Sequence, residues 1–160
     1  MRRICGVVIV FGIILALIAL VIRHRSANPE AAFEKLIMAP IPGSVRSIEQ
    51  GHVVGMDGGF WALRFFINNA DLQNILSAGH YLQVNADDEF RRAYPDSQGD
   101  ANSLRNQYFK QWNLKIEKTT MIKVDLTSNW LVYTVLDAGH KKYIFSETNT
   151  SETVFVGYDY

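Results

Sequence analysis

The sequence predicts an α+β fold: an N-terminal transmembrane helix, then a domain in which an antiparallel sheet is covered by about three helices. Three observations lead to this fold class. An uncharged apolar run opens the chain, a hairpin signal follows it, and helix-like segments then give way to β-rich runs joined by short turns. We expect a membrane anchor with flanking arginines at 1–26, a juxtamembrane helix and Pro-rich connection at 27–43, and a globular domain at 44–160.

The apolar run from Ile4 to Ile22 contains 19 residues without a charge. As a helix it would be about 28 Å long, which nearly matches the hydrocarbon thickness of about 30 Å. It has no polar stripe of the kind that a soluble core helix carries. The best local cleavage position, after Ala27, places Arg25 where a signal peptidase needs a small residue. We therefore expect an uncleaved single-pass anchor, and a cleaved signal peptide or a soluble helix are the alternatives.

The anchor would contact the lipid bilayer through residues 4–22, with these side chains inside the membrane: Ile4, Val10, Leu15 and Ile22. Its orientation is weakly encoded, because arginines stand on both sides of the run. The short N-terminal head favours a domain outside the cytoplasm. We expect a single-pass protein of the cell inner membrane with an extracytoplasmic C-terminal domain.

The first elements after the anchor are a short helix and a strand pair. Residues 28–30 (NPE) combine a cap, a helix-starting proline and an acid in the first turn, and the prolines of 38–43 (MAPIPG) end that helix. Two strand-like runs at 44–56 and 60–67 then flank an Asp-Gly-Gly turn. The second run is apolar on both faces, which predicts a central strand. Arg64 interrupts it, and we expect either a structural ion pair or a contact with a ligand anion.

Helices and strands follow along the rest of the chain. We expect helices at 68–79, 87–95 and 101–112, with a short strand at 80–84. We expect further strands in an antiparallel meander, and the helices on one face of the sheet. These four strand-like runs are 119–126, 129–137, 140–147 and 153–160.

Charge and motif content limit the function classes. The residues after Arg25 include 12 basic and 16 acidic side chains, a net charge of −4 that gives no electrostatic reason to bind nucleic acid. We interpret the pairs Arg91-Arg92 and Lys141-Lys142 as solvated surface, and the acids 87–89 as the favourable start of a helix. No serine-hydrolase elbow, phosphate loop or metal-binding spacing occurs. We therefore expect no catalytic residues, metal ligands or cofactor.

Aromatic residues are dense in the last third of the chain. Core and cross-strand packing accounts for most of them. The alternative is a candidate recognition surface for a peptide, a glycan or another envelope protein, made of these residues: Arg64, Tyr133, Tyr143, Tyr158 and Tyr160.

The segment Phe33–Leu76 carries a Pro-x-Pro entry, a Phe-rich strand and an Asp-Leu-x-x-Ile-Leu helix. In these features it resembles small uncharacterised bacterial proteins that follow an N-terminal anchor or lipoprotein signal. The resemblance implies an envelope location and assigns no catalytic residues. We expect a membrane-anchored envelope protein whose domain is a non-catalytic binding or interaction module. The alternatives are a hydrolase-like enzyme with a dispersed active site and an accessory subunit of a membrane complex.

Overall fold

The computed structural model describes residues 28–55, 58–137 and 140–159. Its helices and strands alternate in a mixed order, which confirms the α+β class. The described elements are α2 (Pro29–Leu36), β1 (Arg46–Gly55), β2 (Gly58–Phe66), α3 (Asn69–Ala78), β3 (Leu82–Val84), α4 (Ala86–Ala93), α5 (Ala101–Thr120), β4 (Trp130–Asp137), β5 (His140–Glu147) and β6 (Glu152–Asp159).

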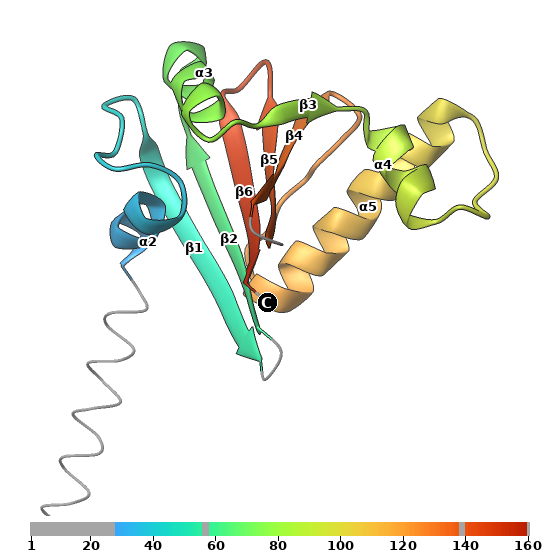
Figure 1. The fold of residues 1–160 in the computed structure, drawn as a ribbon, viewed down its shortest axis with the longest axis horizontal. Helices are drawn as coiled ribbons and strands as arrows, with labels where there is room; N and C mark the ends of the chain where they lie inside the picture. Colours follow the sequence, from blue (N-terminus) through green and yellow to red (C-terminus); the bar gives the residue numbers. More distant parts are fainter. Residues whose placement is uncertain (1–27, 56–57, 138–139, 160) are drawn as a thin grey trace, which may run out of the picture.

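The strands form one six-stranded sheet in the order β1-β2-β6-β5-β4-β3 (Figure 1). Every described pairing is antiparallel. The predicted hairpin is β1 with β2, and the predicted meander is β4, β5 and β6. The last strand of the meander pairs with β2, so that Leu63 lies opposite Phe155. This pairing joins the hairpin and the meander, and it makes β2 an interior strand as predicted.

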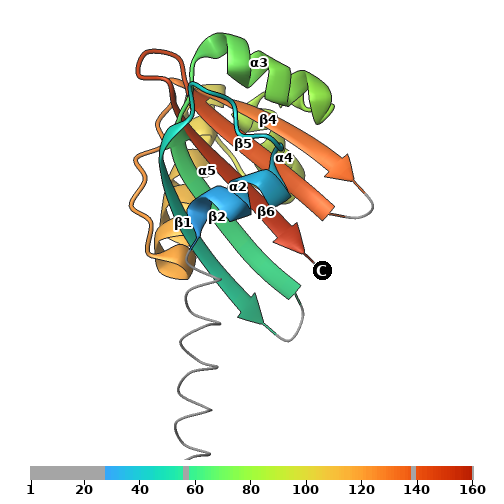
Figure 2. The same cartoon turned by 90° about the vertical axis from the view of Figure 1, so that its left-hand side faces the viewer.

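The helices lie on both faces of the sheet, and the prediction that they cover one face is wrong. In Figure 2, α2 and α3 lie in front of the strands while α4 and α5 lie behind them. The physical reason is visible in the interior strands, whose side chains are buried on both faces. Ile144 and Phe155 face the α2–α3 side, whereas Phe145 and Val154 face the α4–α5 side. A sheet with two apolar faces needs a cover on each.

The caps of α2 and α3 follow the sequence signals. In α2, the backbone N–H groups of Glu30 and Ala31 donate to Asn28 Oδ1, each at 3.1 Å. In α3, the N–H of Asp71 donates to Asn68 Oδ1 at 2.7 Å. These bonds satisfy donors that a helix N-terminus otherwise leaves unpaired. Both helices bury apolar side chains against the sheet, with Phe33 of α2 fully buried.

Helix α5 is longer than predicted, and it replaces the start of the strand expected at 119–126. Trp112, Ile116 and Thr120 continue its buried stripe at i, i+4 spacing. The helix ends at Met121, whose φ of 63° is left-handed. The prediction of a strand is therefore wrong here: 119–120 belong to α5, and 121–127 have no regular secondary structure.

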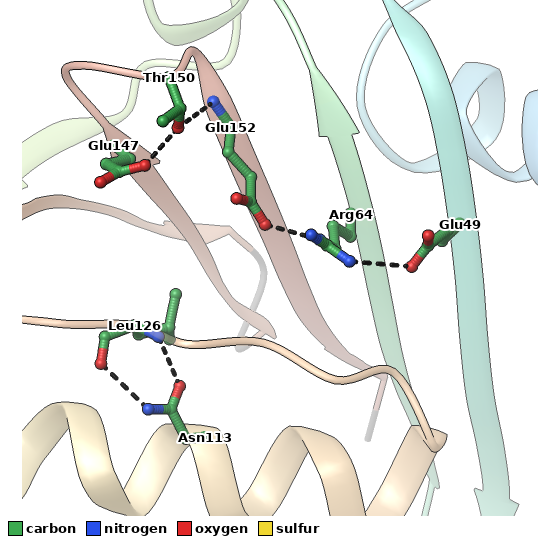
Figure 3. A network of polar contacts seen from close by, with 7 residues as sticks. All are labelled: Glu49, Arg64, Asn113, Leu126, Glu147, Thr150 and Glu152. Atoms are coloured by element: carbon green, nitrogen blue, oxygen red, sulfur yellow. Dashed lines mark hydrogen bonds and ion pairs between the residues drawn. The ribbon is translucent and has the colours of Figure 1, made fainter.

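The segment after α5 is extended without pairing to a strand. Ile122 and Leu126 are buried in the α4–α5 core, which produces the strand-like alternation in the sequence. The side-chain amide of Asn113 takes the place of a strand partner (Figure 3). Its Nδ2 donates to the Leu126 carbonyl at 3.0 Å, and the Leu126 N–H donates to its Oδ1 at 2.8 Å.

The C-terminal end of α5 lies against β1 at a position where only glycine fits. A Cβ placed on Gly51 would lie 2.5 Å from the carbonyl oxygen of Thr120. No such restriction applies at Gly43, around which a Cβ would meet nothing within 4 Å. Gly51 therefore sets the distance between the helix and the edge strand.

In the described part of the chain, no helix has the length and apolar character required to cross a bilayer. The predicted anchor, with Ile4, Val10, Leu15 and Ile22, lies outside the described residues.

Candidate functional site

One pocket of the described structure combines aromatic walls with several charged groups. It has a volume of about 380 Å³ and lies where α4, α5, β5 and β6 meet. We refer to it as the aromatic cleft, and its lining residues are Glu89, Arg92, Ala93, Tyr94, Tyr108, Gln111, Trp112, Lys115, Lys141, Tyr143 and Tyr158.

Helical and strand periodicity bring these residues together. On α5, the residues 108, 111, 112 and 115 follow i, i+3, i+4, i+7 spacing and so share one face. On β5, Lys141 and Tyr143 are two residues apart and therefore point to the same face of the sheet. The cleft is thus built from rigid elements rather than from loops.

Trp112 stands at the centre of the aromatic wall. The centroid of its ring lies 4.9 Å from that of Tyr143, 6.2 Å from that of Tyr158 and 6.3 Å from that of Tyr108. Aromatic pairs at these separations attract each other beyond simple burial. Trp112 and Tyr143 are also buried members of the core, so the cleft is a continuation of the core to the surface.

A buried carboxylate holds one end of the cleft. Glu89 of α4 is almost fully buried, and its Oε2 accepts from Lys141 Nζ of β5 at 2.8 Å. Its other oxygen accepts from Arg92 on the same helix. Burial lowers the pKa of Lys141, but its hydrogen bonds with Glu89 and Tyr143 raise the pKa more, so the net shift is upward. The carboxylate is therefore neutralised, and it links α4 to the sheet.

Lys115 presents a charge that no carboxylate in the described residues neutralises. Its Nζ lies over three rings, 4.5 Å from the centroid of Tyr158, 5.4 Å from that of Trp112 and 5.7 Å from that of Phe60. Burial lowers the pKa of this ammonium group. The contacts are cation–π interactions, which stabilise the cation without cancelling its charge.

Tyr108 places a buried hydroxyl at the wall of the cleft. Within the described residues this hydroxyl has no hydrogen-bond partner. Burial, and then the neighbouring Tyr143, raise the pKa of Tyr108 well above its ordinary value. The indole of Trp112 opposes this shift but does not satisfy the hydroxyl. A buried donor without a partner costs folding free energy.

The predicted recognition residues do not form one surface. Tyr143 and Tyr158 both line the aromatic cleft. Tyr133 is buried in the core on the opposite face of the sheet, under α2 and α3. Tyr160 lies outside the described residues. The structure thus brings together two of the predicted tyrosines.

Arg64 lies away from the aromatic cleft and is ion-paired (Figure 3). Its Nε donates to Glu152 at 2.6 Å and its Nη1 to Glu49 at 3.5 Å. The hydrogen bond with Glu152 raises the pKa of the guanidinium, against the opposing effect of burial. Arg64 borders a polar pocket of about 440 Å³ that also contains Asp125 and Glu147. Its charge is already compensated, so it behaves as the structural ion pair considered from the sequence.

Sequence reasoning missed the charged part of the cleft. The sequence predicts solvated surface for the pairs Arg91-Arg92 and Lys141-Lys142, yet Arg92 and Lys141 bind the buried Glu89. The available signal was alternation along β5, which places Lys141 on the same face as Tyr143. Among the described residues, no group of three or more His, Cys, Asp or Glu is placed to hold a metal ion.

Comparison with protein-family models, curated proteins and solved structures finds no match for this chain. The site is therefore interpreted from its own geometry.

Proposed function

We propose that this chain is a membrane-anchored envelope protein whose extracytoplasmic domain is a non-catalytic binding module, with the aromatic cleft as its ligand site. The observation that carries the proposal is the cleft itself, in which rings from α5, β5 and β6 surround a space of about 380 Å³. Ligand sites of proteins are typically about 300–1,000 Å³, mostly apolar, with a few oriented polar groups. The aromatic cleft has this composition.

The charges in the cleft favour binding over hydrolysis. A general base needs an available lone pair near the reacting group. Among the described residues that line the cleft, Glu89 alone carries a carboxylate, and both of its oxygens accept from cations. Both of its oxygens are thus already occupied by cations. The cleft is better equipped to hold a ligand than to transform one.

The size of the cleft favours a compact ligand unit. A space of about 380 Å³ accommodates one ring-containing group rather than the face of a folded partner. A free small molecule, one residue of a peptide or one terminal sugar of a glycan would each fit this description. A partner envelope protein would then be recognised through one such group.

The test of the binding proposal uses the full chain in non-ionic detergent micelles. Amide shifts in NMR spectra would be followed during titration with a panel of small ring compounds. We expect shifts that cluster on α5 and β5. Gln111→Trp should fill the cleft and abolish them, while Gln107→Trp, an exposed position on the same helix outside the cleft lining, should leave them unchanged. The absence of clustered shifts for every compound would refute the proposed site.

The location has its own test. A reporter enzyme that is active only outside the cytoplasm would be fused after Tyr160. Activity of the fusion, together with retention of the uncleaved chain in the inner membrane, would support a single-pass anchor through residues 4–22. An inactive fusion that is otherwise intact would refute the extracytoplasmic placement.

A further inference from the structure

The aromatic cleft carries a positive charge, although the domain as a whole is acidic. Among the described residues that line it, three are cations, Arg92, Lys115 and Lys141, and one is a carboxylate, Glu89. The local net charge is therefore +2, while the residues after Arg25 sum to −4. The cleft is thus positive in a domain that is negative overall, and a positive site favours a ligand with a negative charge.

Two of the three cations are already engaged. Lys141 and Arg92 each bind one oxygen of Glu89. Lys115 has neither an ion pair nor a hydrogen bond to a carboxylate in the described residues, and it lies over rings of the cleft wall. Glu89 carries one negative charge, so its group with Arg92 and Lys141 keeps +1. The other positive charge is on Lys115 Nζ, which has no carboxylate partner among the described residues.

The rings next to Lys115 Nζ indicate the shape of the uncharged part of the ligand. Trp112 and Tyr158 lie within 5.4 Å of Lys115 Nζ, measured to the ring centroids. Tyr143 lies beyond Trp112, with the two ring centroids 4.9 Å apart. A flat body that packs against this wall places a short side arm within reach of the ammonium group. Aromatic bodies gain most from such a wall, because ring pairs attract each other beyond their buried area.

We infer that the cleft binds a small organic anion, with an aromatic ring against Trp112 and Tyr143 and a carboxylate paired with Lys115. The inference rests on the proposed binding function and specifies its ligand class. The ammonium keeps its contacts with the rings when the carboxylate arrives. The rings desolvate the Lys115 ammonium in part, so the pair is screened by water less than a fully solvated pair.

The test compares two probes that differ in charge and have nearly the same shape, indole-3-acetate and indole-3-acetamide. Each is titrated into the full chain in non-ionic detergent micelles, whose headgroups do not compete for Lys115. Dissociation constants come from NMR shifts of cleft amides. We expect the acid to bind at least tenfold more tightly than the amide, with the shifts centred on Trp112 and Tyr143.

Lys115→Gln removes the charge at an exposed position, and Lys110→Gln makes the same change outside the cleft lining on the same helix. We expect the tenfold preference to fall to within twofold in Lys115→Gln and to persist in Lys110→Gln. An unchanged preference in Lys115→Gln overturns the role of Lys115. Equal binding of acid and amide at the cleft overturns the anion inference while leaving the binding function in place. If neither probe shifts the cleft amides, the inference is overturned, and the ring-compound panel decides separately on the binding function.

Discussion

The two cations that bind Glu89 should contribute very differently to stability. Glu89 is 4% exposed, Lys141 is 35% exposed and Arg92 is 70% exposed. Arg92 is a solvated cation on the same helix at i, i+3, and helical pairs at this spacing are worth about 0.2–0.5 kcal/mol. Lys141 comes from another element, and its loss leaves the buried carboxylate with one solvated partner.

We therefore expect Lys141→Met to lower the free energy of unfolding by about 2 kcal/mol, and Arg92→Gln by about 0.5 kcal/mol or less. Breaking a buried pair costs about 3–5 kcal/mol. The loss expected here is smaller than that range, because Lys141 is one-third exposed and Arg92 still pairs with Glu89. The double variant Glu89→Leu, Lys141→Met should recover part of the loss, since it leaves no carboxylate in the core.

The assay is urea unfolding of the full chain in micelles, followed by near-UV circular dichroism, which reports the aromatic core. Unchanged urea m-values would show that the unfolded state is comparable between variants. Equal losses in Lys141→Met and Arg92→Gln would refute the reasoning, because they would show that burial of the cation does not determine its contribution. So would a double variant less stable than Lys141→Met.

Three further predictions concern stability in the same assay. Asn113→Ala should lower the free energy of unfolding by about 2–3 kcal/mol, because it leaves the N–H and carbonyl of Leu126 without partners. Asn113→Asp keeps the acceptor and should lower it less; equal losses in the two variants would contradict this. Gly51→Ala should cost about 1–3 kcal/mol through overpacking, whereas Gly43→Ala should change stability by less than about 0.5 kcal/mol. Tyr108→Phe should raise stability by about 1 kcal/mol at pH 7 by removing a buried unpaired hydroxyl. Above pH 10 the unfolded state loses the Tyr108 proton that the folded state keeps, so stability should fall as pH rises, and less steeply in Tyr108→Phe.

Local signals in the sequence predict most elements of this fold because their causes are local. Asn28 and Asn68 cap helices through hydrogen bonds two or three residues away. The strand pair predicted on either side of the Asp-Gly-Gly sequence forms as β1 and β2, and the two apolar faces of 60–67 correctly predict an interior strand. Each of these features depends on neighbours within a few residues.

The errors arise where a distant contact decides the outcome. Residues 121–126 alternate like a strand but pair with none, and the backbone of Leu126 is held by Asn113 of the preceding helix. The pairing of β2 with β6 spans about half the chain, and no short motif encodes it. The placement of helices on both faces follows from this pairing, since it buries β2 between neighbours and leaves two apolar faces to cover.

The candidate site is harder to predict because most of its wall is also core. Aromatic density drew attention to Tyr143 and Tyr158, but the same pattern included Tyr133, which the sheet turns to the other face. Only the order of the strands separates these cases. The ion pair of the buried Glu89 with Lys141 joins residues 52 positions apart, and nothing in the sequence near either residue identifies its partner.

Some residues of the cleft wall also belong to the core, and this limits where mutations can change ligand specificity. Trp112 and Tyr143 belong to the buried core, so replacing them weakens the fold as well as any ligand contact. Three polar lining residues are exposed and lie outside the core: Arg92, Gln111 and Lys115. Changes in ligand preference are therefore most accessible at these three positions, where charge and shape can vary while the aromatic wall stays fixed. Exchange of Lys115 for Glu should accordingly reverse the charge preference of the cleft while costing little stability, and loss of folding in that variant would show that Lys115 is structural.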